Sequence, residues 1–173
     1  MRIVVDAMGG DYAPGAVVEG AICASGQYKI GITLVGDVQK INKELAKHKT
    51  KNLDIDILST DEVIEMHEPA AASVRKKRNS SIVRGIDLLK VGKGDAFVSA
   101  GNTGAVVCAA TLSLRMLAGI ERPGISIMIP TLHEPSLLID VGANINPKPL
   151  HLLHYAIMSD AYCRCVLHRE NPK

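Results

Sequence analysis

Residues 96–104 read Ala-Phe-Val-Ser-Ala-Gly-Asn-Thr-Gly. The first four, 96–99, predict a strand that begins with three apolar residues, and 103–117 carry the clearest helical pattern in the chain. Between the two lie small and polar residues of the kind that make tight turns. A strand that leads into a helix through such a turn is the repeating unit of parallel α/β proteins.

The same order recurs along the whole chain. Strands are predicted at 3–5, 30–35, 53–58, 125–129 and 137–141, and helices at 14–25, 38–47, 80–90 and 149–167. The segment 61–78 predicts a loop and a short helix. This alternation predicts an α/β fold of three layers, α/β/α, with a mostly parallel sheet. Residues 1–173 are expected to form a single α/β domain or the N-terminal part of a longer protein, because another strand would be expected after the last helix.

The composition is that of a globular protein with an aliphatic core. Hydrophobic residues make up 47% of the chain and charged residues 22%, which argues against wholesale disorder. There is no Trp and one Phe, so Val, Ile, Leu, Ala and Met must fill the core, as in buried parallel strands. The net charge of +2 argues against a nucleic-acid partner, which would need a concentrated basic face.

Cysteine usage and the first residues indicate the cellular compartment. The four cysteines form no CxxC pair, which argues against a zinc site and a disulfide framework and fits a reducing cytosol. The opening MRIVVDAMGG resembles neither a signal peptide nor a membrane span. We therefore expect a soluble cytoplasmic protein that could still touch a membrane surface.

Three predicted strands end in small, polar turns: DAMGGD (6–11), SAGNTG (99–104) and DVGAN (140–144). In open α/β sheets, ligands bind beyond the carboxyl ends of the strands. Glycine lets the backbone approach an anion, and the helix that follows offers free N–H groups. The turns therefore predict phosphate binding, strongest at SAGNTG. The alternative is that the glycines only make tight turns and that Asn102 or Thr103 only caps a helix.

The strongest positive patch is the run Arg75-Lys76-Lys77-Arg78, followed by Asn79-Ser80-Ser81. Arginine gives bidentate contacts to phosphate and lysine acts as a point charge, so an inner residue of the run could bind phosphate. The outer residues, Lys77 among them, could attract an acidic partner. The alternative is a solvated charged face.

Nucleotide-binding motifs and the histidines do not point to a further functional site. No GxxxxGK[ST] occurs and no GxGxxG follows a strand, so no standard nucleotide site is predicted. His151 and His154 are three residues apart on a predicted helix, but no carboxylate set completes a metal site, and packing or surface roles are favoured. His67 and His133 lie in predicted loops, and nothing singles out either as a general acid.

An ordered set of motifs carries a family resemblance. The segments VDAMGGDYAP, LVGD, VRKKRNSS, SAGNTGA, GIERP, IDVGAN and HYAIM occur in this order. Together they resemble the phosphate acyltransferases of bacterial phospholipid synthesis, over nearly the whole chain. Members of that family are considerably longer, and they usually have Gly where this chain has Ser159.

The resemblance implies a fold like that of isocitrate and isopropylmalate dehydrogenases and phosphotransacetylase. It implies transfer of a fatty acyl group from acyl carrier protein to inorganic phosphate, without a metal or an organic cofactor. It also implies a homodimer with possible peripheral contact at the inner membrane face. Two other functions stay open: a nicotinamide-dependent dehydrogenase of similar fold, and a non-catalytic fragment that needs its second half.

The family resemblance, together with the glycine-rich turns and the basic run, predicts a set of site residues. Catalytic roles are expected for three residues: Asn102, Asp140 and Asn144. Phosphate or substrate binding is expected for Asp6, Gly9, Gly10, Asp11, Arg75, Lys76, Ser80, Gly101, Thr103 and Gly104. Phosphate is itself the nucleophile, so the protein must hold it beside a thioester and stabilise the oxyanion that forms.

Overall fold

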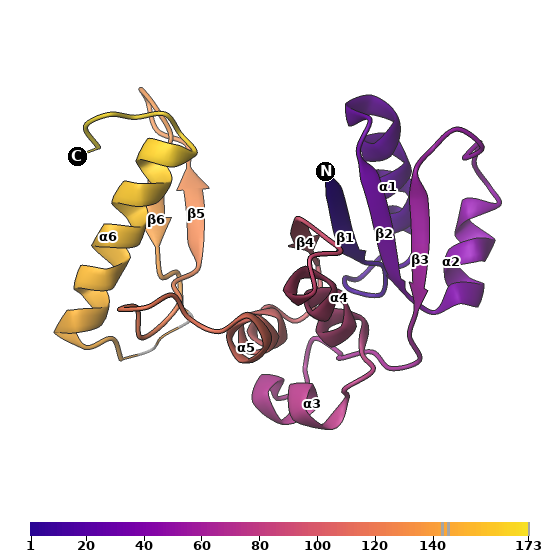
Figure 1. The fold of residues 1–173 in the computed structure, drawn as a ribbon, viewed down its shortest axis with the longest axis horizontal. Helices are drawn as coiled ribbons and strands as arrows, with labels where there is room; N and C mark the ends of the chain where they lie inside the picture. Colours follow the sequence, from indigo (N-terminus) through magenta and orange to yellow (C-terminus); the bar gives the residue numbers. More distant parts are fainter. Residues whose placement is uncertain (143, 145, 173) are drawn as a thin grey trace. The chain divides into compact units, whose positions relative to one another are not determined.

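The computed structural model describes residues 1–142, 144 and 146–172, and the chain forms two compact units, Met1–Arg115 and Met116–Lys173. Figure 1 traces the order of the elements. The first unit contains β1 (Arg2–Asp6), α1 (Gly15–Tyr28), β2 (Gly31–Gly36), α2 (Val38–Leu45), β3 (Ile55–Ser59), α3 (Ala70–Lys76), α4 (Ser81–Lys90), β4 (Ala96–Val98) and α5 (Thr103–Leu114). The second contains β5 (Ser126–Ile129), β6 (Ser136–Ile139) and α6 (Pro149–Cys165).

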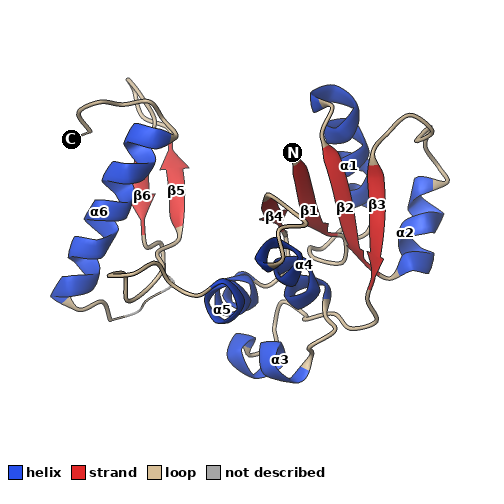
Figure 2. Ribbon diagram, in the orientation of Figure 1, coloured by secondary structure: helices blue, strands red, loops and turns tan. Residues whose placement is uncertain are grey.

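The first unit is built on a four-stranded parallel sheet with the order β3-β2-β1-β4 (Figure 2). The chain adds β2 and β3 on one side of β1, then crosses back and adds β4 on the other side. Helices α1 and α2 pack on one face of the sheet, and α4 packs against β1, β2 and β4. The predicted three-layer α/β/α fold with a mostly parallel sheet is therefore confirmed.

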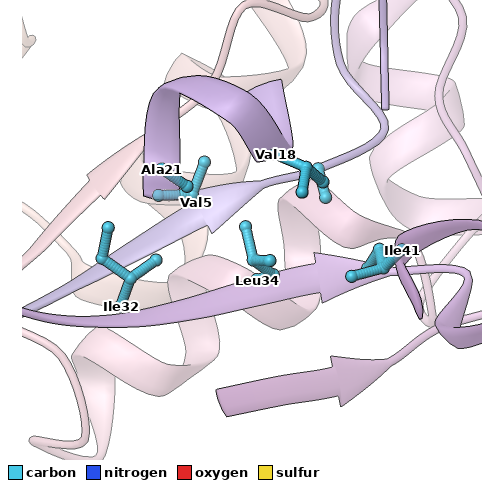
Figure 3. Close-up of a cluster of buried hydrophobic side chains, with 7 residues drawn as sticks. Val5, Val18, Ala21, Ile32, Leu34 and Ile41 are labelled. Atoms are coloured by element: carbon cyan, nitrogen blue, oxygen red, sulfur yellow. The ribbon is translucent and has the colours of Figure 1, made fainter. Parts of the chain in front are cut away.

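Alternation along the strands divides the core into two clusters. Val5, Ile32 and Leu34 meet Val18, Ala21 and Ile41 of the two covering helices, as Figure 3 shows. On the α4 side, Phe97 pairs with Val4 in the sheet and packs with the buried side chains of α4 and α5. Fully burying one such aliphatic side chain stabilises the folded state by about 1.5–3 kcal/mol. The core is aliphatic, as the composition predicts, and its single Phe lies at the edge strand.

In the second unit, β5 and β6 pair antiparallel, with Ser126 opposite Ile139 and Ile129 opposite Ser136. They do not extend the parallel sheet. The connection 130–135 explains the pairing, because a parallel crossover needs a dozen or more residues whereas a hairpin needs few. The second strand ends at Ile139, two residues earlier than predicted, because Asp140 takes a left-handed φ of 61°.

The helices begin close to the predicted positions. Asp37 caps α2, since its Oδ1 accepts hydrogen bonds from the amides of Gln39 and Lys40. Ser80 occupies the N-cap position of α4, but its side chain makes no capping bond. Among the described residues, no helix combines the length and the apolar character needed to cross a membrane.

Candidate functional site

The sheet has its switch point between β1 and β4. After β1 the chain turns to α1 on one face, and after β4 it turns to α5, which packs on α4 on the other side. Connections that leave in opposite directions open a crevice at the carboxyl ends of the two strands, where α/β proteins bind ligands. The turns 6–11 and 99–104 both lie there, because Val5 pairs with Val98 in the parallel ladder.

A buried carboxylate joins the two turns. Asp6, 1% exposed, accepts a hydrogen bond of 2.7 Å from Ser99 Oγ through Oδ2 and one of 3.0 Å from the Met8 amide through Oδ1. Ser99 Oγ in turn accepts the Gly101 amide at 3.0 Å. These bonds fix both turns to the end of the sheet. The sequence analysis did not single out Ser99. The feature that could have identified it is its position directly after β4, the strand that pairs with β1.

The two turns also touch backbone to backbone. A Cβ built on Gly9 would lie 2.5 Å from Asp6 Oδ2 and 2.7 Å from the Gly101 amide nitrogen. Gly10 adopts a left-handed φ of 104° beside Ala100. Glycine is required here because the space that a side chain would need is already filled by the partner turn.

Asn102 is the N-cap of α5. Its Oδ1 accepts the Ala105 amide at 3.0 Å, and its Nδ2 faces the carbonyls of Glu65, Met66 and Glu68 at 3.0–3.2 Å. The side chain is 7% exposed, and both of its polar atoms are used inside the protein. Asn102 therefore has a structural role: it caps the helix and fastens the loop that precedes α3.

Thr103 and Gly104 are exposed in the first turn of α5. The N–H groups of a first turn have no carbonyl partner inside the helix and carry a partial positive charge. Asp11 is also exposed, on the turn after β1. The structure thus brings Asp6, Gly9, Gly10, Gly101, Asn102, Thr103 and Gly104 together at one end of the sheet.

The basic run divides into exposed and engaged residues. Arg75, Lys76 and Arg78 are exposed. Lys77 instead donates to the Glu68 carboxylate and, at 2.6 Å, to the Val63 carbonyl. Lys77 is thus engaged within the fold, unlike its exposed neighbours, and its role in attracting a partner stays a prediction.

Helix α3 starts close to α5. A Cβ on Gly104 would lie 3.0 Å from Ala70 Cβ, so the first residue of α3 touches the first turn of α5. Arg75 lies five residues further, about 7.5 Å along the helix axis. Ser80 is fully buried, and no hydrogen-bond partner for its Oγ is found in the described part of the chain.

An apolar cavity of about 300 Å³ adjoins the turns. Its walls are aliphatic side chains of β1, α1 and β4, among them Val5, Val17 and Val98, and its polar end is formed by Asp6 and Ser99. The 53% exposure of Val98 follows from this opening on the α1 side of the edge strand. Such a cavity suits an extended aliphatic group.

Asp140 and Asn144 belong to the second unit. Asn144 Nδ2 donates to Tyr155 Oη at 2.7 Å, to the Pro123 carbonyl at 3.1 Å and to Asp140 Oδ1 at 3.4 Å. Its Oδ1 accepts a bond from Arg122. Three of the recognised motifs, GIERP, IDVGAN and HYAIM, therefore meet in one network; Ala143 of the second motif lies outside the described residues.

Two groups in this unit are buried with their partners. Burial, together with a hydrogen bond to Asp140, raises the pKa of Tyr155 above its ordinary value. His151, 3% exposed, accepts the Lys148 amide on Nδ1 and bonds Glu121 Oε2 at 3.1 Å through Nε2. His154 accepts the Glu121 amide. Both histidines are therefore packing residues of α6.

Comparison with known proteins agrees with this architecture. A family model described as "Fatty acid synthesis protein" matches residues 1–173. The chain belongs to this family. Its relatives include proteins named phosphate acyltransferase from Geotalea daltonii (50% identical over 173 residues), Geobacter sulfurreducens (49%) and Herpetosiphon aurantiacus (45%). The alignments cover 100% of this chain but 50%, 50% and 47% of those proteins, so the chain spans about half the length of the curated relatives it matches.

A solved structure supports the fold. The phosphotransacetylase from Streptococcus pyogenes superposes with a TM-score of 0.73 at 21% sequence identity, over 98% of this chain and 55% of that one. The family and the fold predicted from the ordered motifs are thus both confirmed. The roles of the individual site residues stay predictions.

Substituting Gly9 tests the contact between the turns. We expect Gly9→Ala to destabilise the protein by about 1–3 kcal/mol, because its Cβ would overlap Asp6 and the Gly101 backbone. Gly20→Ala is the matched control: apart from its own stretch of helix, no atom lies within 4 Å of its Cβ, and it lies in α1, where Ala is favoured over Gly by about 0.5–1 kcal/mol. Urea unfolding measures the free energy of unfolding of both variants. Equal stabilities of Gly9→Ala and Gly20→Ala would contradict the close approach of the two turns at Gly9.

Asn102→Ala tests the capping role. We expect the free energy of unfolding to fall by at least about 1 kcal/mol, because the helix loses its cap and the loop carbonyls lose their donor. Asn42→Ala on the exposed face of α2 is the control and should change stability by less than about 0.5 kcal/mol. Thermal unfolding compares the two; an effect of Asn102→Ala no larger than that of the control would contradict the structural role.

Glu68 predicts a pH dependence. The bond from Lys77, followed by those from the Glu65 amide and Ser73, lowers the pKa of Glu68 from 4.5 to about 2. A lowered carboxyl pKa contributes stability that is present above about 4.5 and is lost as pH falls toward 2. The free energies of unfolding of the wild type and of Glu68→Gln should therefore converge as the pH falls from about 4.5 toward 2. A stability difference between the two proteins that stays constant over this pH range would contradict the assignment.

Proposed function

We propose that this protein transfers a fatty acyl group from acyl carrier protein to inorganic phosphate and yields an acyl phosphate for phospholipid synthesis. The observation that carries the proposal is the meeting of two glycine turns at the switch point, in front of the first turn of α5. The names of the curated relatives agree with it.

The N-terminus of α5 suits an anion. Free amides of Thr103 and Gly104, with the helix dipole behind them, favour bound phosphate. The bonds that fix Asp6, Ser99 and Gly101 hold the turn in place before the substrate arrives. Donors that need no reorganisation stabilise developing negative charge most effectively.

In the proposed reaction, the protein itself forms no covalent bond to the acyl group. A phosphate oxygen attacks the thioester carbon, so a C–O bond forms and a tetrahedral oxyanion appears. The C–S bond then breaks, and its electron pair leaves with the carrier thiol, which takes the proton released by phosphate. Holding phosphate beside the thioester removes most of the entropic cost of this encounter.

The apolar cavity provides room for the acyl chain. Its lining combines the turn residues Asp6 and Ser99 with aliphatic side chains of α1 and β4. An acyl chain in it would bring the thioester carbonyl to the polar end, beside the turns. Burying methylene groups there would contribute about 0.8 kcal/mol for each.

The exposed cations Arg75, Lys76 and Arg78 suit an acidic carrier protein. Opposite charge speeds diffusional encounter and orients the partner, and this effect weakens as salt rises. We place the carrier on this side of α3, with Arg75 or Lys76 as the residues that could also reach phosphate.

The proposal includes a homodimer in the cytoplasm, at times at the inner membrane face. The side chains of Leu150, Leu153 and Ile157 form a stripe on α6 with exposures of 44%, 56% and 53%. Contact with a second copy or with lipid would remove this apolar surface from water.

An acyl-transfer assay tests the proposal. The protein is incubated with an acyl carrier thioester and phosphate, acyl phosphate is trapped with hydroxylamine, and free thiol is followed in parallel. We expect thiol release that requires phosphate and yields hydroxamate. The Geotalea daltonii relative, run alongside, is the reference. Thiol release that ignores phosphate, or none where the relative reacts, rejects the proposal for this chain.

A further inference from the structure

The loop 63–68, between β3 and α3, curls around one nitrogen atom. Asn102 Nδ2 faces the carbonyls of Glu65, Met66 and Glu68. An amide nitrogen carries two hydrogens, so three converging carbonyls share them. The curl brings carbonyl dipoles of like sign together, and a donor at its centre offsets their repulsion.

The curl is closed from the other side by Glu68. Its carboxylate accepts the Glu65 amide at 3.0 Å, Ser73 Oγ at 2.8 Å and the Lys77 ammonium. Ser73 lies in α3, and Lys77 is the C-cap residue that directly follows this helix. Lys77 also bonds the Val63 carbonyl, so it holds both ends of the loop 63–68.

The ion pair between Lys77 and Glu68 is partly buried. The side chains of Lys77 and Glu68 are 27% and 19% exposed, whereas Arg75 and Lys76 beside them are exposed. Bonds to a charged acceptor are about twice as strong as neutral ones. Removing either charge would free the ends of the loop and, with them, the three carbonyls that fix the Asn102 amide.

We propose that Glu68 and Lys77 are positioning residues for the anion site: they hold the loop carbonyls that orient Asn102, and Asn102 holds the first turn of α5. In this orientation Asn102 Oδ1 occupies the Ala105 amide and leaves the amides of Thr103 and Gly104 to the phosphate. The step to phosphate rests on the proposed function, whereas the control of Asn102 does not.

Hydrogen exchange of the Ala105 amide tests the inference without reference to activity. We expect Glu68→Gln and Lys77→Met to speed this exchange about tenfold, the factor that follows from losing one bond to a charged group. Glu65→Gln is the matched control, because this exposed neighbour uses only its backbone in the curl. Lys77→Arg keeps the charge and should retain most of the protection.

Kinetics supply the second measurement. In the acyl-transfer assay, Glu68→Gln and Lys77→Met should raise KM for phosphate about tenfold and change kcat less, and Glu65→Gln should change neither. Unchanged Ala105 protection in both variants overturns the inference, and so does lost protection with an unchanged KM. If the wild type shows no phosphate-dependent thiol release, the proposed function fails, and Ala105 exchange alone decides whether the pair controls Asn102.

Discussion

The hydrogen bond between Asp6 and Ser99 is the interaction on which the candidate site depends. It joins the ends of β1 and β4, which lie 93 residues apart in sequence and side by side in the sheet. A buried carboxylate is tolerated only when its oxygens are hydrogen-bonded, and Asp6 meets this condition with a hydroxyl and an amide. Because Ser99 passes the bond on to Gly101, the geometry of the second turn is tied to the first.

This constraint explains the amino acids around it. Gly9 lies too close to Asp6 and to the Gly101 backbone for a side chain, and a Cβ on Gly101 would meet Asp6, Gly9 and Ser99 at 3.2 Å. The N-cap residue Asn102 directly follows Gly101, and its side-chain amide donates a hydrogen bond to the loop 63–68. The first turn of α5 is therefore held in place by both the joined turns and the fastened loop.

The second unit uses polar side chains differently. Asp140, Asn144 and Tyr155 bond mainly to one another and to the Pro123 carbonyl, so they connect Asn144 to α6 and to the segment that precedes β5. The hairpin could have been predicted from the sequence, because the six residues of 130–135 are too few for a parallel crossover. The recurrence of strand and helix patterns favoured the parallel sheet instead, since pattern alone does not say which strands pair.

The sequence by itself determined the elements, the aliphatic core and the glycine-rich turns at the strand ends. These depend on local spacing, on glycine and on residue type, all of which are readable along the chain. The ordered motifs also determined the family. The tertiary structure alone decided which polar groups are free. Asn102 Nδ2 finds its partners 34–37 residues away, and Lys77 pairs with the Glu68 carboxylate at the other end of α3. The sequence context of neither residue shows these partners. The physical reason is that a polar side chain bonds whichever group the fold brings within hydrogen-bond distance, and the packing of turns, loops and helices sets that neighbour.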